Sequence, residues 1–428
     1  MRLLVVGSGG REHALVKKLC KEAGVSEIIC APGNAAISQE QRTRIVDVDV
    51  SDASEILHVA KMEGVEFTIV GPELPLANGV ADAFSVAGQP LFGPSKGAAK
   101  LESSKAFSKE FMKRHGVPTA SFEVCTDLSH ALDVLTSGRF GFPVVVKADG
   151  LAAGKGVTVA RDKAEAEAAV NAAMVEQRFG SAGKSVVLEE CLAGPEVSYF
   201  VITDGKRHLA LPSAQDHKRV FDGDEGPNTG GMGAFAPSPI FSVELENRVI
   251  REIVRPTLDG MRLEGCEYRG VLYVGLMLTH DGPQVIEFNV RFGDPEAQVI
   301  LPMIESDLAP VLFSAAVGDL DDCDWRLHSD PHVGVVMASG GYPGSYEVGF
   351  PIAGLERATS IPGVHVVHAG TALQDNTFIT KGGRVLTVVA RGNSYGEAVL
   401  RAYEAVALID FQGSHVRTDI GQKALFSA

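Results

Sequence analysis

The stretch VVGSGGREHAL, residues 5–15, decides the architecture of the amino-terminal part of the chain. An apolar run, Leu3–Val6, leads into three closely spaced glycines and then into a segment with helical patterning. A strand, a glycine-rich turn and a helix in this order are typical of a phosphate-binding turn in a parallel α/β sheet. A dinucleotide-binding motif has a third glycine where this chain has Glu12. The turn therefore leaves open which phosphate it holds.

The same rhythm of short apolar runs and helix-like stretches continues to about residue 104. Strands are predicted at Leu3–Val6, Glu27–Cys30, Phe67–Val70 and Pro90–Phe92, and helices at Arg11–Glu22, Ala53–Glu63 and Pro75–Ala87. This alternation predicts an open parallel sheet. Loops 7–12, 31–36 and 71–79 leave the carboxyl ends of its strands, where ligands bind in such sheets, so we expect one shared crevice.

A second unit begins near residue 103, with a helix that Ser104 caps and Gly116 ends. Residues 121 to about 317 have a mixed α and β pattern, and 318–332 form a polar linker. The last segment, about 330–428, predicts strands at 332–338, 364–368 and 384–390 and a helix at 394–406. The fold class is therefore α/β with α+β, in three domains.

Composition excludes several classes of protein. The 428 residues are 45% hydrophobic and 22% charged, values typical of globular domains. A net charge of −15 argues against nucleic acid as the main partner. The six cysteines form no CxxC pair, which indicates a reducing compartment. The opening MRLLVVGSGG is too short for a signal peptide, and no run reaches the ~18 apolar residues of a membrane helix. We expect a cytoplasmic protein.

The stretch FPVVVKADGLAAGKGVTVA, 142–160, carries charge and glycine together. Lys147 lies in an apolar strand, and a loop with Gly150, Gly154 and Gly156 surrounds Lys155. Glycines let backbone N–H groups approach an anion, and the lysines add positive charge. This pattern predicts a hairpin lid over nucleotide phosphates; the alternative is a flexible hairpin with solvated lysines.

The stretch SVVLEECLAGPEVSYFVI, 185–202, places acidic residues beside a turn. A strand ends in Glu189 and Glu190, and Leu192 and Glu196 flank the Gly-Pro turn. Such carboxylates can accept hydrogen bonds from a nucleotide's exocyclic amine and ribose hydroxyls. A solvated strand end is equally compatible with this pattern.

The stretch QVIEFNVRFGDPEAQ, 284–298, is the strongest local signal. Strand side chains alternate between faces, so Ile286, Phe288 and Val290 are predicted to face the core. The other face then carries Glu287, Asn289 and Arg291. Carboxylate and amide oxygens suit Mg²⁺, and a guanidinium binds phosphate or carboxylate. The alternative is a solvent-facing strand with mixed polar residues.

Residues 216–237, DHKRVFDGDEGPNTGGMGAFAP, lack hydrophobic periodicity. We expect a long loop without regular structure, and such loops inside compact domains are usually functional or disordered. Its mixed charge suits a small zwitterionic or phosphorylated ligand. His217 is a candidate general base, although a structural role is the more common one for a single histidine.

Together these stretches resemble the phosphoribosylamine–glycine ligase family, within the ATP-grasp superfamily. The resemblance rests on GSGGREHAL, PGNA, GPE-PL--G, KADGLAAGKGV, QDHKRV-D-D-GPNTGGMGA, IEFN-RFGDPE and a terminal R-DIG at Arg417 and Asp419–Gly421, and runs from residue 3 to about 424. It implies that ATP, glycine and 5-phosphoribosylamine react to glycinamide ribonucleotide, ADP and phosphate in purine synthesis.

The resemblance also implies a division into domains. An amino-terminal Rossmann-like substrate-binding domain spans residues 1–104, an ATP-grasp domain of two subdomains spans 105–318 with a lid at about 121–190, and a mixed α/β domain spans 330–428. The GSGGRE turn then holds the phosphorylated sugar rather than a dinucleotide, which agrees with Glu12.

Site residues follow from the same resemblance. The expected metal ligands for Mg²⁺ or Mn²⁺ are Glu287 and Asn289. The expected catalytic residues are Arg291, Asp294 and Lys155. The expected ATP-binding residues are Lys105, Lys147, Gly154, Gly156, Glu189, Glu190, Leu192 and Glu196. The expected substrate-binding residues are Gly9, Gly10, Arg11, Glu12, Gly33, Asn34, Glu73, Asn78, Asp216, Lys218 and Asn228.

Three other interpretations remain open. Another ATP-grasp carboxylate–amine ligase would share the ATP residues. A nicotinamide-dependent oxidoreductase would explain GSGG but leaves Glu287, Asn289 and Arg291 without a role. A nucleotide-sensing module would bind ATP without turnover. The expected partners are small molecules, with no nucleic acid or membrane, and with transient contact to neighbouring enzymes of purine synthesis.

Overall fold

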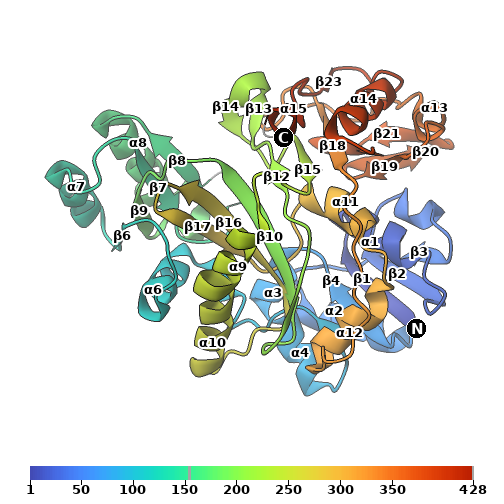
Figure 1. Cartoon of the computed structure of the whole chain (residues 1–428), viewed down its shortest axis with the longest axis horizontal. Coiled ribbons are helices and arrows are strands. Elements are labelled where there is room, and N and C mark those ends of the chain that lie inside the picture. The colour runs from blue at the N-terminus through green and yellow to red at the C-terminus, as the bar shows by residue number, and fades with distance from the viewer. Residues whose placement is uncertain (153–155, 427–428) are drawn as a thin grey trace.

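The computed structural model describes residues 1–152 and 156–426. The predictions made for Gly154 and Lys155 therefore lie outside the described residues. In Figure 1 the amino-terminal sheet lies at the lower right and the carboxy-terminal sheet at the upper right, while the predicted lid lies at the left and a central sheet runs between them. Among the described residues, no helix has the length and apolar character needed to cross a membrane.

The amino-terminal sheet has five strands, and all neighbouring strands are parallel, as predicted. Its order is β3-β2-β1-β4-β5, with β1 (Arg2–Gly7), β2 (Glu27–Pro32), β3 (Thr43–Ile45), β4 (Phe67–Val70) and β5 (Leu91–Phe92). Its helices are α1 (Gly10–Leu19), α2 (Ala53–Met62), α3 (Glu73–Asn78) and α4 (Val80–Val86). The single helix predicted over Pro75–Ala87 is wrong, because Gly79, with φ of +95°, separates α3 from α4.

The middle of the chain forms two antiparallel sheets. The lid sheet has the order β6-β9-β7-β8, with β6 (Phe122–Cys125), β7 (Val144–Ala148), β8 (Val157–Ala160) and β9 (Val186–Glu190). The central sheet has the order β11-β10-β16-β17, with β10 (Glu196–Thr203), β11 (His208–Ala210), β16 (Gly270–Thr279) and β17 (Gly282–Asn289). Helices α7 (Leu128–Ser137) and α8 (Lys163–Met174) pack on the lid sheet.

Other helices of this region support the central sheet. They are α5 (Lys100–Ser103), α6 (Lys105–His115), α9 (Val243–Val249), a π-helical turn (Ile250–Val254), α10 (Arg255–Leu263), α11 (Glu296–Ile300) and α12 (Leu308–Val317). The predicted cap is confirmed: Ser104 Oγ accepts a hydrogen bond from Phe107 N at 3.1 Å, and Gly116 ends α6 with φ of +67°.

The carboxy-terminal sheet has the order β12-β15-β18-β22-β19, with β23 paired to β18. Its strands are β12 (Gln215–Asp216), β15 (Gly233–Ala236), β18 (His332–Ser339), β19 (Val364–His368), β22 (Arg384–Arg391) and β23 (Ser414–His415). Beside it lie α13 (Leu355–Thr359), α14 (Tyr395–Val406), α15 (Gln422–Leu425) and the hairpin β20 (Thr371–Gln374) with β21 (Thr377–Thr380). The three strands and the helix predicted here are confirmed.

The glycine-rich stretch 216–237 is ordered, so the prediction of a loop without regular structure is wrong. It supplies strands β12 and β15 to the carboxy-terminal sheet, and between them β13 (Arg219–Phe221) and β14 (Glu225–Asn228) form a hairpin. The prediction failed because these short strands pair through their backbone and carry little apolar periodicity.

The predicted linker, residues 318–332, packs against the rest of the chain: Trp325 Nε1 donates to Ala210 O at 2.9 Å.

Strand β17 contains an irregularity that changes one predicted face. Its pairing with β16 shifts between Glu287 and Val285, so Ile286 is the extra residue of a β-bulge. Val285, Phe288 and Val290 are buried in the core, whereas Ile286 is only partly buried. The prediction that Ile286 faces the core is therefore wrong, because the bulge shifts the alternation by one residue.

Candidate active site

Two buried lysines hold the carboxylate of Glu189 between the lid and the central sheet. Glu189 Oε2 lies 2.8 Å from Lys109 Nζ and 2.9 Å from Lys147 Nζ. Lys147 Nζ also donates to the carbonyl of Ile286 at 3.1 Å, which joins β7 to β17. Burial lowers the pKa of Lys109 to about 8. Glu189 Oε1 is buried without a hydrogen-bond partner among the described residues.

The predicted metal ligands lie beside these lysines. Asn289 Nδ2 is 3.5 Å from Glu287 Oε1, which confirms that both side chains share one face of β17. Burial raises the pKa of Glu287, but Lys218, Lys147 and Lys105 outweigh it and hold the pKa below its usual value. The site therefore keeps an ionised carboxylate and an amide oxygen close to several cations.

Arg291 is fixed by two carboxylates from the amino-terminal part of the chain. Its Nη2 is 2.9 Å from Glu102 Oε1 and 3.1 Å from Asn289 Oδ1, and its Nε is 3.3 Å from Glu73 Oε2. Glu102 also accepts from Val290 N at 2.7 Å. These contacts connect the end of β17 to α3 and α5, so Arg291 is held in one orientation at the junction of the domains.

Asp294 connects this cluster to the carboxy-terminal domain. Its Oδ2 is 3.2 Å from Arg384 Nη2, and its Oδ1 accepts from Gln298 Nε2 at 2.8 Å. Burial raises the pKa of Asp294, but the positive charges of Arg384 and Arg11 outweigh it and lower the pKa. Asp294 is therefore an ionised carboxylate between two arginines from different domains.

Glu12 occupies the place where a dinucleotide motif has glycine. Its Oε2 accepts from Gly9 N at 2.6 Å, and its Oε1 is 2.7 Å from Arg11 Nε. Arg11 Nη1 reaches the carbonyl of Phe292 at 3.2 Å. A side chain at Gly71 would stand 2.0 Å from Glu12 Oε1, so two of the three predicted loops meet at this carboxylate.

Charged residues of the 216–237 stretch belong to the same cluster, because the positive charge of Lys218 is among those that lower the pKa of Glu287. Lys218 Nζ is 2.7 Å from Glu196 Oε2, and burial raises the pKa of Asp216 to about 7. A buried group of Ser198, Tyr273 and Glu296 lies beside them: Tyr273 OH donates to Glu296 Oε1 at 2.9 Å. Several anions and cations therefore converge where the lid, central and carboxy-terminal sheets meet.

Comparison with known proteins follows the same three units. Models of the phosphoribosylglycinamide synthetase N domain, ATP-grasp (A) domain and C domain match residues 1–102, 103–297 and 332–423. The chain belongs to the phosphoribosylglycinamide synthetase family. The resemblance noted in the sequence is thereby confirmed, together with the α/β class and the ATP-grasp fold.

Relatives match over the whole length of the chain. A phosphoribosylamine–glycine ligase of Vibrio parahaemolyticus is 48% identical, with 99% of both chains covered. A solved phosphoribosylamine–glycine ligase of Thermotoga maritima has a TM-score of 0.83 at 33% identity, and covers 98% of this chain and 100% of its own. A trifunctional purine biosynthetic protein of Gallus gallus is 49% identical over 99% of this chain and 42% of its own length.

Within this synthetase-family chain, several predicted substrate residues have structural partners. Asn34 Oδ1 accepts from Ala36 N and Ile37 N, both at 3.0 Å, and Asn34 Nδ2 donates to Ser8 O at 2.9 Å, so its amide is engaged by the backbone. Asn78 is exposed and donates to Ser51 O at 2.8 Å. These contacts hold the loops in shape, and ligand contacts of both residues stay predictions.

The remaining predicted residues are placed around the same junction. Lys105 Nζ donates to Gly150 O at 2.8 Å, and burial lowers the pKa of Lys105. Glu190 is exposed at the end of β9, Leu192 is partly buried, and Asn228 pairs with Arg219 in the hairpin. Gly33 N donates to Gly7 O at 3.1 Å, which joins the first and second loops. Gly10 begins α1, and Gly156 precedes β8.

Sequence reasoning missed several polar residues at this junction. They are Glu102, Lys109, Ser198, Tyr273, Glu296 and Arg384. Glu296 lies within the quoted GDPE motif, which was a usable signal. The others come from segments predicted only as ordinary strands and helices, and tertiary contacts alone give them their neighbours.

Proposed function

We propose that this protein joins glycine to 5-phosphoribosylamine at the expense of ATP, giving glycinamide ribonucleotide, ADP and phosphate. The observation that carries the proposal is the convergence of Lys105, Lys147 and Glu287 with Arg291 where three domains meet. Full-length similarity to phosphoribosylamine–glycine ligases supports the choice of substrates.

The donor set fits a divalent metal ion that is completed by phosphate. Among the described residues, no cluster of three or more His, Cys, Asp or Glu side chains could enclose an ion by itself. The donors present are instead one ionised carboxylate, Glu287, and the amide oxygen of Asn289, which in this structure accepts from Arg291 Nη2 at 3.1 Å and has a second lone pair. Mg²⁺ commonly takes its other ligands from water and phosphates. We propose Mg²⁺ or Mn²⁺ here, where it would neutralise charge on the ATP phosphates.

The chain's own cations prepare the phosphoryl transfer. The γ-phosphoryl group passes to a carboxylate oxygen of glycine, and ADP leaves. Lys147 is buried and Lys105 partly buried, and the charges of both act on Glu287, so they can offset negative charge that spreads over the phosphate oxygens. Arg291 is held by Glu102 and Glu73 and can orient the carboxylate or the acyl phosphate without moving.

The second step needs positioning and no protein nucleophile. The amine of 5-phosphoribosylamine attacks the acyl carbon of glycyl phosphate, inorganic phosphate leaves, and the amide forms. We propose that Gly9, Gly10, Arg11 and the N-terminus of α1 hold the sugar phosphate, because helix N–H groups and a guanidinium favour an anion. The phosphate would take over Gly9 N and Arg11 Nε from Glu12, which engages both in this structure. Asp294, ionised between Arg384 and Arg11, can accept a hydrogen bond from the attacking amine and so orient it, and the departing phosphate takes up the proton that the amine loses.

The first experiment measures ADP release with Mg-ATP and glycine, with and without 5-phosphoribosylamine generated in the cuvette. ADP should rise only when all substrates are present, and glycinamide ribonucleotide should be the product. Turnover with a different carboxylate or amine, but not with these, would keep the ATP-grasp chemistry and replace the substrate assignment with another ligase.

We also propose transient contact with neighbouring enzymes of purine synthesis. The chicken relative carries its matching region within a longer protein whose name describes three purine biosynthetic functions. Cross-linking in cell extracts of the native host would test the contact, and recovery of the uncross-linked protein alone would contradict it. A cytoplasmic location stays a prediction.

A further inference from the structure

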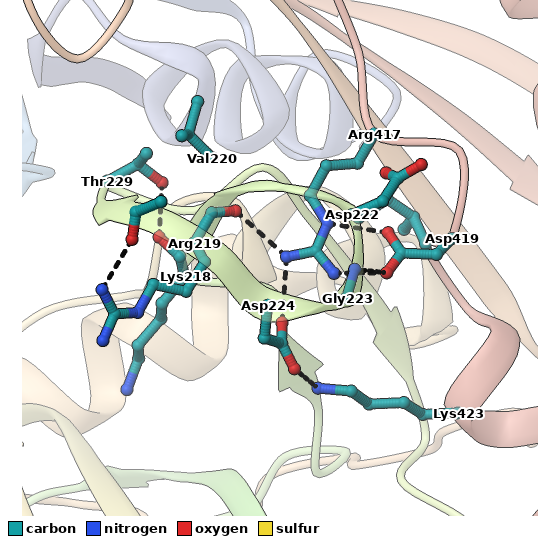
Figure 2. Close-up of polar contacts among 12 residues, drawn as sticks. Lys218, Arg219, Val220, Asp222, Gly223, Asp224, Thr229, Arg417, Asp419 and Lys423 are labelled. Carbon is teal, nitrogen blue, oxygen red and sulfur yellow. Dashed lines mark hydrogen bonds and ion pairs between the residues drawn. The ribbon is translucent and has the colours of Figure 1, made fainter.

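Arg417 is a fully buried guanidinium outside the proposed reaction centre. Its Nε and Nη2 donate to the two carboxylate oxygens of Asp419 at 2.7 and 2.6 Å. Its Nη1 donates to Asp224 Oδ1 at 2.9 Å and to the carbonyl of Arg219 at 3.0 Å. Figure 2 shows the guanidinium extending from the carboxy-terminal segment to these two residues of the β13–β14 hairpin.

The turn of the hairpin is held by the same segment at further points. Gly223 N donates to Asp419 Oδ2 at 2.9 Å, and Thr418 N donates to Asp222 Oδ1 at 2.8 Å (Figure 2 shows the contact of Gly223). Lys423 Nζ lies 2.6 Å from Asp224 Oδ2, so its positive charge offsets the second of the two carboxylates, Asp224 and Asp419, that surround Arg417. We call Arg417, Thr418 and Asp419 the carboxy-terminal latch.

Apolar packing contributes little to the placement of this hairpin. Residues 221–227 are all exposed, whereas Val220 is buried against Met232 and Ala338. The two strands pair at Arg219–Asn228 and Phe221–Glu225 with an irregular register. A short hairpin with so little buried surface is marginal alone, so polar contacts set its position. They are the contacts with the latch and that of His415 Nε2 with the carbonyl of Val220 at 2.8 Å.

The hairpin continues directly into the proposed reaction centre. Arg219, whose carbonyl accepts from Arg417, follows Lys218, whose Nζ is bound to Glu196. The carbonyl of Lys218 accepts from Thr229 N at 2.7 Å and Thr229 Oγ1 at 2.8 Å, which fixes the base of the hairpin. His217, the residue before Lys218, is buried with both ring nitrogens unpartnered among the described residues, and burial lowers its pKa to about 4.

We propose that Arg417 is a positioning residue for the ligase reaction: through Asp224 and the Arg219 carbonyl it holds the β13–β14 hairpin so that Lys218 and Asp216 face the substrates. The carboxy-terminal domain then completes a centre that the ATP-grasp domain alone leaves loosely ordered. The inference rests on the proposed function for the identity of the small substrates.

The test compares Arg417→Lys, Asp224→Ala and their double variant with the wild type. Each single variant should lower kcat/KM for glycine or 5-phosphoribosylamine by roughly 10- to 100-fold, because small displacements of reacting groups are costly. Hydrogen exchange should speed up at amides 219–229 and stay unchanged in β16 and β17. The double variant should lose less than the product of the two single losses, because both changes remove the contact between Arg417 and Asp224.

Asp330→Asn is the matched control, since Asp330 pairs with Arg391 in the same domain, away from the hairpin. It should leave kinetics and hairpin exchange unchanged. A merely structural role would instead lower Tm, hairpin protection and activity together, whereas we expect the Tm of Asp224→Ala to shift by less than about 3 °C. Asp224 is exposed, so Asp224→Ala tests the latch even if Arg417→Lys does not fold.

Unchanged hairpin exchange, or a loosened hairpin with unchanged kcat/KM, would overturn the proposal. Failure of the wild type to use glycine and 5-phosphoribosylamine would instead contradict the proposed function. The comparison of variants would then be repeated with the substrates that the wild type does use. A failure of the positioning role can therefore be distinguished from a failure of the proposed function.

Discussion

The carboxylate of Glu12 organises the amino-terminal turn at the scale of single residues. It accepts from Gly9 N, pairs with Arg11 and fills the space beside Gly7 and Gly71. The third glycine of a dinucleotide motif is replaced by a side chain that closes the turn from within. A glycine is then required at position 71, on the opposite loop.

Gly71→Ala should destabilise the protein by about 1–3 kcal/mol, because a methyl group there would overlap Glu12 Oε1. Urea unfolding followed by circular dichroism measures the change. Gly24→Ala is the control, since a side chain at Gly24 would meet nothing within 4 Å. Equal urea midpoints of unfolding for the two variants would show that Glu12 can move aside without a loss of stability.

Glu287→Gln should raise the metal concentration needed for half-maximal ADP release by roughly 10- to 100-fold. The change removes the only charged member of the pair formed with Asn289 and leaves Lys105, Lys147 and Lys218 less well compensated. We therefore also expect a lower Tm without ligands. Glu244→Gln, at an exposed position in the first turn of α9, is the control. A metal titration identical to that of the wild type would exclude Glu287 as a ligand.

At the scale of elements, Asp149 joins the lid to helix α6. Its Oδ1 accepts from Ser104 Oγ at 3.0 Å and from Ala106 N at 3.1 Å, and its Oδ2 accepts from Ser185 Oγ at 3.2 Å. Asp149 immediately precedes Gly150, whose carbonyl accepts from Lys105. The start of the glycine-rich loop is therefore tied to a helix N-terminus outside the lid sheet.

Asp149→Ala should raise KM for ATP about tenfold, because the loop loses its attachment to α6. It should also cost about 1 kcal/mol of stability, as loss of a helix cap does. Asp162→Ala is the matched control: Asp162 caps α8 in the same lid by accepting from Glu165 N at 2.9 Å. The control should lose similar stability at unchanged KM; an equal rise of KM in both variants would assign the effect to general loosening of the lid.

At the scale of the whole molecule, neutral histidines line the contact between the amino-terminal and carboxy-terminal domains. His13 Nδ1 accepts from His368 N at 2.8 Å, so its proton lies on Nε2, which is 3.1 Å from Glu40 Oε1. Burial lowers the pKa of His13, and it lowers the pKa of His332 to about 4 and those of His365 and His368 to about 3.

The free energy of unfolding should therefore fall as pH drops below about 6.5, the pKa of these groups in the unfolded chain. Below that pH the unfolded chain binds protons that the folded protein resists, and this difference favours unfolding. The loss should continue toward pH 4. Urea titrations at several pH values measure it, and a flat profile between pH 6.5 and 4.5 would contradict it.

His368→Gln should make this profile shallower, since glutamine does not titrate. Glu40 affects stability in a different pH range. Burial raises its pKa, but His13 and Lys17 outweigh this and lower the pKa to about 2. The stability that Glu40 contributes is therefore lost only below about pH 4.5. An unchanged slope between pH 6.5 and 4.5 in His368→Gln would show that His368 is protonated in both states or in neither.

The sequence by itself determined the elements with clear periodicity and the chemistry of the longest motifs. The parallel strands β1, β2 and β4 follow from apolar runs between turns, and the Ser104 cap follows from local hydrogen bonding. The shared face of Glu287 and Asn289 follows from strand alternation. Such features depend on neighbours within a few residues, so local rules suffice.

Only the tertiary structure decided how distant segments meet. The bulge at Ile286 depends on pairing with β16, and the β13–β14 hairpin depends on Arg417, nearly two hundred residues away. The partners of Arg291 come from α3 and α5, and that of Asp294 comes from β22. Buried charges take their partners from whichever elements the fold brings within reach, and no local pattern encodes that choice.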